Sequence, residues 1–207
     1  MLNVPARLTE GITVARCNCN GSGACVSTNE GNQIGLDSAG CLFVPTLAVQ
    51  NGQFQLPADN NLGPGFLNTW TDSGLAMTLP EAGTYDIQAD AGGIISLQVN
   101  LVTAGSGNTS TAKVLCRLWD TTNAVAVSPT VDQVAAVGVA LPTTTSQAKG
   151  SVGSTGTIRQ FYTVTGPTAL SLQVQTTLVV ASGVTATIIA DSLLLAANTS
   201  MRYVRIG

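Results

Sequence analysis

The 207-residue sequence predicts an all-β protein, and three features carry this prediction. Apolar and polar residues alternate with a period of two in several segments, β-branched residues are frequent there, and Gly, Pro, Asn and Ser separate the segments. No stretch keeps a helical period. Many strands separated by turns are typical of a sandwich or a barrel.

The first region, residues 1–65, differs in composition from the rest. It is dense in Gly, Asn and Cys, and it ends in the turn-forming run at 60–65. Pro64 in this run has no N–H to donate, so a central strand cannot continue through it. We therefore expect an N-terminal arm with a hairpin at 1–65, followed by a β-sandwich at 66–207.

The clearest predicted strand is 95–101, where Ile95 and Leu97 alternate with Ser96 and Gln98. One face of this strand is apolar, and the other carries hydroxyls and amides. The same pattern predicts a second strand at 170–180.

The apolar face of this second strand starts at Leu170, and Thr176 is its one polar interruption. Further strands are predicted at 84–90, 113–119, 124–127, 157–164, 185–195 and 201–206. Residues 131–139 are ambiguous, because their Ala and Val content also fits a short helix, which Gly138 and Pro142 would end.

Charge is scarce along the chain. Charged residues make up 9% of the sequence and hydrophobic residues 44%, whereas about 25% charged is ordinary. A surface with so little charge offers little repulsion between copies, so we expect an oligomer.

Three kinds of partner or location are not expected. The eight cations form no cluster that could follow a nucleic-acid backbone. The apolar stretch at 188–197 contains Asp191 and is too short to cross a membrane. Residues 1–7 lack the apolar run of a secretory signal, so synthesis in the cytoplasm is expected.

The chain has no histidine, which removes the commonest general base and the usual zinc ligand. Asp86 and Asp90 share one strand face about 13 Å apart, at roughly 3.3 Å per residue. This spacing exceeds the roughly 5 to 9.5 Å of a glycosidase pair. We expect no enzymatic activity and no cofactor, and interpret these two carboxylates as a solvated face.

Four of the five cysteines, Cys17, Cys19, Cys25 and Cys41, lie in the N-terminal region. Their spacing contains no C-x2-C pair, so free thiols are favoured over disulfides or a metal site, and all three readings stay open. Cys116 shares a face with apolar neighbours and is expected in the core. Aromatic rings are few, and most should be buried; an exposed sugar-binding ring is considered for Trp70 or Tyr162.

Residues 26–45, VSTNEGNQIGLDSAGCLFVP, resemble a pattern of phage tail and head-appendage proteins, approximately I-S-x-D-x-G-N-x-L-x-x-G-x-D-G-G-L-Y-V-P. The chain departs from the pattern at Asn29 and Ala39, which replace Asp, and at Asp37 and Cys41, which replace Gly. The lost acids argue against a cation there. The resemblance implies an attachment interface at Val26, Gly31, Asn32, Ile34, Leu36, Gly40, Leu42, Phe43, Val44 and Pro45.

The pattern of this segment also predicts a small β-hairpin. Turns are expected at 31–32 and 39–40, and Ile34, Leu36 and Leu42 supply a narrow apolar face. So small a hairpin hardly folds alone, so neighbouring subunits or a docking surface should cover it.

Residues 66–207 look like the trimeric, tumour-necrosis-factor-like (TNF-like) jelly-roll heads of phage fibres and decorations. The segments 79–87, 118–123 and 203–206 carry this resemblance. It implies a jelly-roll β-sandwich and a homotrimer.

Together the two resemblances imply a virion structural protein of a tailed phage, made in the host cytoplasm. A head decoration or head fibre is expected, with the N-terminal region bound to the major capsid protein, the neck or the tail. The alternative is a tail-associated module that binds a host surface glycan or protein. A glycan depolymerase is the least favoured reading.

Overall fold

The protein is described by a computed structural model that covers residues 35–36, 42–43, 50–103, 109–127, 131–141 and 145–207. The chain divides into two compact units, Met1–Ala48 and Val49–Gly207. In the first unit, β1 (Gly35–Leu36) pairs antiparallel with β2 (Leu42–Phe43), so that Leu36 lies opposite Leu42.

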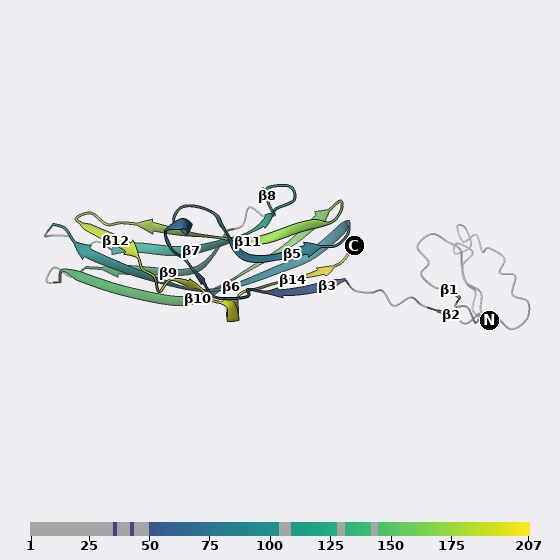
Figure 1. Ribbon diagram of the computed structural model, residues 1–207, viewed down its shortest axis with the longest axis horizontal. Helices are drawn as coiled ribbons and strands as arrows, with labels where there is room; N and C mark the ends of the chain where they lie inside the picture. Colours follow the sequence, from purple (N-terminus) through teal and green to yellow (C-terminus); the bar gives the residue numbers. More distant parts are fainter. Residues whose placement is uncertain (1–34, 37–41, 44–49, 104–108, 128–130, 142–144) are drawn as a thin grey trace, which may run out of the picture. The chain divides into compact units, whose positions relative to one another are not determined.

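The second unit consists of two antiparallel sheets (Figure 1). Sheet I contains β3 (Asn51–Gln55), β4 (Asn60–Asn61), β6 (Gly83–Leu101), β10 (Gln147–Val164), β12 (Val184–Ile188), β13 (Leu193–Leu194) and β14 (Ser200–Arg205). The long strand β6 is its axis. β10 pairs along one side of β6, and β14, β13 and β12 pair in succession along the other. β3 and β4 complete the sheet beyond β14 and β13.

Sheet II contains β5 (Thr71–Leu79), β7 (Thr109–Asp120), β8 (Val125–Ala126), β9 (Asp132–Ala140) and β11 (Thr168–Val179). β11 lies between β5 and β7, and the far side of β7 pairs with β8 and β9. Two short 3-10 turns, η2 (Pro64–Phe66) and η3 (Ala196–Asn198), interrupt the connections.

The strand order is that of a jelly roll. The first strand of the sandwich is interrupted and consists of β3 and β4. The last strand is also interrupted and consists of β12, β13 and β14. These two strands lie side by side in sheet I. The penultimate strand β11 likewise lies beside the second strand β5 in sheet II. This nesting of late strands beside early ones defines the double Greek key of the jelly roll, and the predicted all-β sandwich is confirmed.

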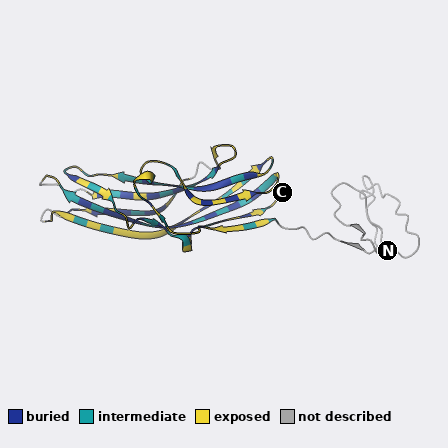
Figure 2. Ribbon diagram, viewed as in Figure 1, coloured by how far each residue is buried: buried dark blue, intermediate teal, exposed yellow. Residues whose placement is uncertain are grey.

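The core fills the space between the two sheets. Buried and exposed positions alternate along the strands (Figure 2). Ile95 and Leu97 on β6, and Leu170 and Leu172 on β11, are fully buried in a single apolar cluster. Burying a side chain of this size contributes roughly 1.5–3 kcal/mol. The faces predicted for these two strands are confirmed.

The boundary expected at 60–65 is wrong, because β3 and β4 belong to sheet I and the division falls after Ala48. The alternation in β3 is weak because its positions are mostly exposed. Strand β5 was not predicted, because Gly74 interrupts its pattern and adopts a φ of 83°. The ambiguous stretch 131–139 forms strand β9, whose residues Val134, Val137 and Val139 are buried.

The strands predicted at 84–90 and 95–101 are one continuous strand, β6. The glycines between them indicate a boundary between two strands in the sequence, but Gly92 is needed because another segment packs closely against the backbone there. A Cβ at position 92 would collide with the Cβ of Asn198 at the end of η3. The strand predicted at 157–164 begins earlier, at Gln147, and the one predicted at 185–195 is split into β12 and β13.

Candidate interaction surfaces

The predicted attachment motif lies in the first unit. Within the part of it that the structure describes, the pairing of β1 with β2 agrees with the expected hairpin. The motif positions Val26, Gly31, Asn32, Ile34, Gly40, Val44 and Pro45 lie outside the described residues. The same is true of the cysteines Cys17, Cys19, Cys25 and Cys41. The attachment role of these residues therefore stays a prediction.

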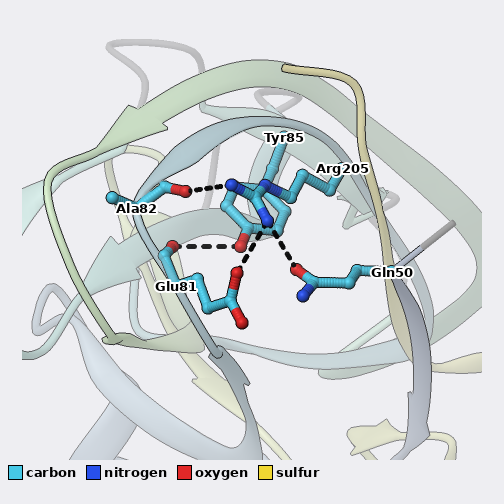
Figure 3. A network of polar contacts seen from close by, with 5 residues as sticks. All are labelled: Gln50, Glu81, Ala82, Tyr85 and Arg205. Atoms are coloured by element: carbon cyan, nitrogen blue, oxygen red, sulfur yellow. Dashed lines mark hydrogen bonds and ion pairs between the residues drawn. The ribbon is translucent and has the colours of Figure 1, made fainter. Parts of the chain in front are cut away.

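A polar network closes the end of the sandwich at which the chain enters it (Figure 3). Nη1 of Arg205 donates to Oε2 of Glu81 at 2.7 Å and to Oε1 of Gln50 at 3.3 Å, and its Nη2 donates to the carbonyl of Ala82 at 2.8 Å. The hydroxyl of Tyr85 donates to the Glu81 carbonyl at 3.0 Å. One guanidinium thus links the entering strand, the turn between β5 and β6, and the C-terminal strand.

Gly83 makes this network possible. Its φ is 149°, and a Cβ there would lie 2.7 Å from Nε of Arg205 and 2.5 Å from the carbonyl oxygen of Gly207. Only glycine permits so close an approach at that backbone angle. The network joins two of the segments, 79–87 and 203–206, on which the jelly-roll resemblance was based.

The outward face of sheet I carries a band of charged and amide groups. Arg159 donates to Oδ1 of Asp86 through Nε at 2.9 Å, and its Nη2 forms an ion pair with Oδ2 at 2.5 Å. This hydrogen bonding holds the pKa of Asp86 below its usual value, against the opposing effect of burial. Arg202 donates to Oε1 of Gln88 at 2.6 Å. These four residues line a hollow of about 280 Å³.

Asp90 binds partners of its own, accepting from Oγ1 of Thr157 at 2.7 Å and from Nε2 of Gln88 at 3.0 Å. The carboxylates of Asp86 and Asp90 therefore face different donors, and the interpretation of a polar strand face holds for both. Beyond this band, the same face exposes Phe161, Val204 and Ile206, with Phe161 59% exposed.

Strand β10 forms the border of sheet I. It is 18 residues long, pairs with β6 along one edge, and is mostly exposed. No strand in the described part of the chain pairs with its other edge. Only Lys149 and Arg159 carry charge along β10, and Val152 is 40% exposed. A long edge strand with so few charges is open to pairing with another chain.

Asp120 ends β7 and is fully buried. It accepts hydrogen bonds from the Asn123 backbone N–H, from Nδ2 of Asn123 and from the Tyr162 hydroxyl, at 2.8, 2.8 and 2.7 Å. Burial would raise the pKa of Asp120, but these hydrogen bonds outweigh it and the pKa is lowered. The hydroxyl of Tyr162, considered above as a sugar-binding ring, is committed to this carboxylate.

The outward face of sheet II carries an aromatic cluster. Cζ of Arg117 lies 4.5 Å from the ring centroid of Trp70 and 4.5 Å from that of Trp119. Nε of Arg117 donates to Oε1 of Gln173 at 2.9 Å. We call these four residues the Trp–Arg cluster. Trp70 was singled out from the sequence; Arg117 and Trp119 were not, although their i, i+2 spacing on a predicted strand puts both on one face.

The described residues contain neither a metal-binding cluster nor a membrane-spanning helix. No group of three or more Cys, Asp or Glu side chains there is arranged to hold a metal ion. No helix in that part of the chain is long and apolar enough to span a membrane. Cys116 is buried as expected, and burial, followed by the charge of Asp132, raises its pKa to about 12.

No model of a known protein family and no curated protein matches this sequence. Among solved structures, the VP2 subviral particle of infectious bursal disease virus is 12% identical over 84% of this chain and 37% of that chain, with a TM-score of 0.38. Eiger TNF from S. frugiperda is 7% identical over 76% of this chain and 85% of that one, with a TM-score of 0.27. The chain spans under half of the VP2 protein, and the jelly-roll assignment rests on the strand order.

Proposed function

We propose that this protein is a non-enzymatic structural component of a tailed-phage virion, a homotrimeric head decoration or head fibre. Its N-terminal region binds the capsid or neck, and the jelly roll projects from the particle. The observation that carries the proposal is the border of sheet I, where one edge of an 18-residue strand has no partner strand in the described part of the chain and carries little charge.

Self-association through this border has a physical basis. Unpaired N–H and C=O groups on an edge strand are a template for another chain, and charged side chains are the usual protection against such pairing. β10 has few charges, and the neighbouring outward face adds the exposed side chains of Phe161, Val204 and Ile206. Association would cover these apolar groups, with a gain of roughly 25 cal/mol per Å² buried.

The N-terminal unit supports attachment. Its described strands β1 and β2 are two residues long each, too short to be stable without a covering surface. They lie within residues 26–45, which resemble the phage appendage pattern. A particle surface would supply the missing cover.

Sedimentation equilibrium of the full chain tests the homotrimer. We expect a trimer at micromolar concentration, and a shift toward monomer when Val152→Lys and Phe161→Lys are combined to charge β10. Val179→Lys is the matched control, because Val179 is 65% exposed at the end of β11 in sheet II. A monomeric wild type, or an equal effect of the control, would contradict the assembly model.

Incorporation into particles tests attachment. A chain lacking residues 1–45 should keep the circular dichroism of a folded sandwich and fail to appear in purified virions, whereas the full chain is incorporated. Incorporation of the shortened chain at the full chain's level would refute the attachment role.

A further inference from the structure

We infer that the Trp–Arg cluster on sheet II binds a saccharide that carries a carboxylate, such as a uronic acid residue of a surface polysaccharide. The inference concerns the outward face of sheet II and stands apart from assembly through sheet I. Its basis is the state of Arg117, whose charge is held in a fixed place without a balancing anion among the described residues.

The guanidinium of Arg117 is fixed on three sides. Two indole rings lie 4.5 Å from Cζ, and the Nε–H is bound to Gln173 at 2.9 Å. Ion pairs in the described part of the chain involve Arg159 and Arg205, and no carboxylate there pairs with Arg117. Burial lowers the pKa of Arg117, as expected for a cation that has lost water and gained no anion.

The terminal N–H groups of Arg117 have no acceptor among the described residues. Such an edge of a guanidinium matches the two oxygens of a carboxylate in a bidentate pair. Two carboxylates lie near Arg117 in the register, and neither forms an ion pair with it. Asp132 is opposite Cys116 on the buried face of β7, and its Oδ1 accepts from the Gln133 N–H at 2.9 Å. Asp72 is opposite Gln173, and its Oδ1 accepts from the Gly74 N–H at 2.9 Å. We therefore expect an anionic group of a bound ligand to pair with the guanidinium of Arg117.

The neighbouring side chains favour a sugar over an acidic peptide. Gln175 is on the same face two residues from Gln173, and Gln133 lies opposite Leu115 in the adjoining row. These amides offer donors and acceptors for hydroxyl groups, and the indole rims offer apolar surface to the C–H faces of a pyranose ring. A uronic acid combines a carboxylate, hydroxyls and a C–H face in one ring, whereas a Glu or Asp side chain lacks the hydroxyls.

The chain provides its own reporter for this site. It has two tryptophans, and both belong to the cluster, so fluorescence excited at the long-wavelength edge of indole absorption, where the three tyrosines do not absorb, reports on this site. We expect trigalacturonate to change the fluorescence saturably and neutral galactotriose to have at least tenfold weaker effect. Arg117→Met should weaken trigalacturonate binding about ten- to hundredfold, the range for losing hydrogen bonds to a charged group.

Two variants separate a binding role from a structural one. Arg117→Lys keeps the charge and removes the planar fork, so binding should still fall about tenfold while the fold, checked by circular dichroism, is retained. Lys113→Gln removes a cation from the same face of β7 and should leave binding within twofold of wild type.

Three outcomes would overturn the inference. Polyglutamate binding as tightly as trigalacturonate would identify an acidic protein partner instead. Equal binding of galactotriose would show that the guanidinium is not used. If none of these probes changes the fluorescence saturably, the Trp–Arg cluster has a structural role only.

Discussion

The hydroxyl of Tyr162 on β10 donates a 2.7 Å hydrogen bond to Oδ2 of Asp120 at the end of β7. Because β10 belongs to sheet I and β7 to sheet II, this bond ties the two layers of the sandwich together. The carboxylate is fully buried, and further donors to it come from the adjoining turn, namely the backbone N–H and Nδ2 of Asn123 and the backbone of Thr122.

Tyr162→Phe should therefore lower the free energy of unfolding by about 1.5–3 kcal/mol, the range for a hydrogen bond to a charged group. Urea denaturation at pH 7 measures this difference. Tyr203→Phe is the control, because Tyr203 is also buried but its hydroxyl makes no hydrogen bond within the described residues, so the change should alter stability by less than about 0.5 kcal/mol. Similar losses in both variants would argue against the role of the bond between the sheets.

The same pair makes stability depend on pH at both extremes. The pKa of Tyr162 is raised to about 12 by burial and by its bond to Asp120, so the folded state holds this proton more tightly. The contribution of Tyr162 to the free energy of unfolding is therefore fully present below pH 10 and is lost as the pH rises toward 12. The pKa of Asp120 is lowered, so its contribution is present above pH 3.8 and is lost as the pH falls below it.

Denaturation curves between pH 9 and 12 test the alkaline arm. Wild-type stability should fall over this interval, and the fall should be smaller in Tyr162→Phe. Parallel curves for the two proteins would mean that other groups cause the alkaline loss.

Thr176 is a polar residue on the apolar face of β11, and its Oγ1 is fully buried with no hydrogen-bond partner among the described residues. It lines a small, mainly apolar cavity of about 250 Å³ together with Leu67, Leu178 and Ile188. Thr176→Val keeps the shape and removes the unsatisfied hydroxyl. We expect it to raise the free energy of unfolding by about 1 kcal/mol or more, measured in urea.

Thr177→Val is the matched control, because Thr177 is on the opposite, outward face of the same strand. It should change stability by less than about 0.5 kcal/mol. A destabilising effect of Thr176→Val would indicate that the hydroxyl has an acceptor, such as an ordered water in the cavity.

The faces of individual strands could be predicted from the sequence, whereas the pairs that join strands could not. A period of two assigns Ile95, Leu97 and Leu170 to the core without knowledge of the fold. The bond between Asp120 and Tyr162 depends on which strands end together, and no local pattern records that. Trp70 reaches Arg117 for the same reason, since it belongs to the connection that precedes β5.

Glycine explains the largest error along the chain. The segments 84–90 and 95–101 are predicted as separate strands because glycine, here Gly92 and Gly93, weakens a strand interior, yet glycine is also required where another segment packs directly on the backbone. The sequence offers no means of separating these two causes, because the segment concerned, η3, lies about a hundred residues later.

A substitution at Arg205 tests whether the local stability of this end of the sandwich depends on a single side chain. Arg205→Met removes the bonds to Glu81, Gln50 and the Ala82 carbonyl while keeping an apolar stem of similar length. The ion pair is partly exposed and should contribute less than about 1 kcal/mol, so global stability should change little. Local opening should respond more strongly.

Hydrogen exchange measures this local opening. The amides of β14 and β3 should exchange about fivefold or more faster in Arg205→Met, while those of β7 and β11 keep their wild-type rates. Arg202→Met is the control on the same strand, because the hydrogen bond from its guanidinium to Gln88 lies on the outward face of sheet I, away from the network. If both variants accelerate exchange equally, loss of a surface cation rather than the network is responsible, and the C-terminal strand is held by its pairing with β3 and β6.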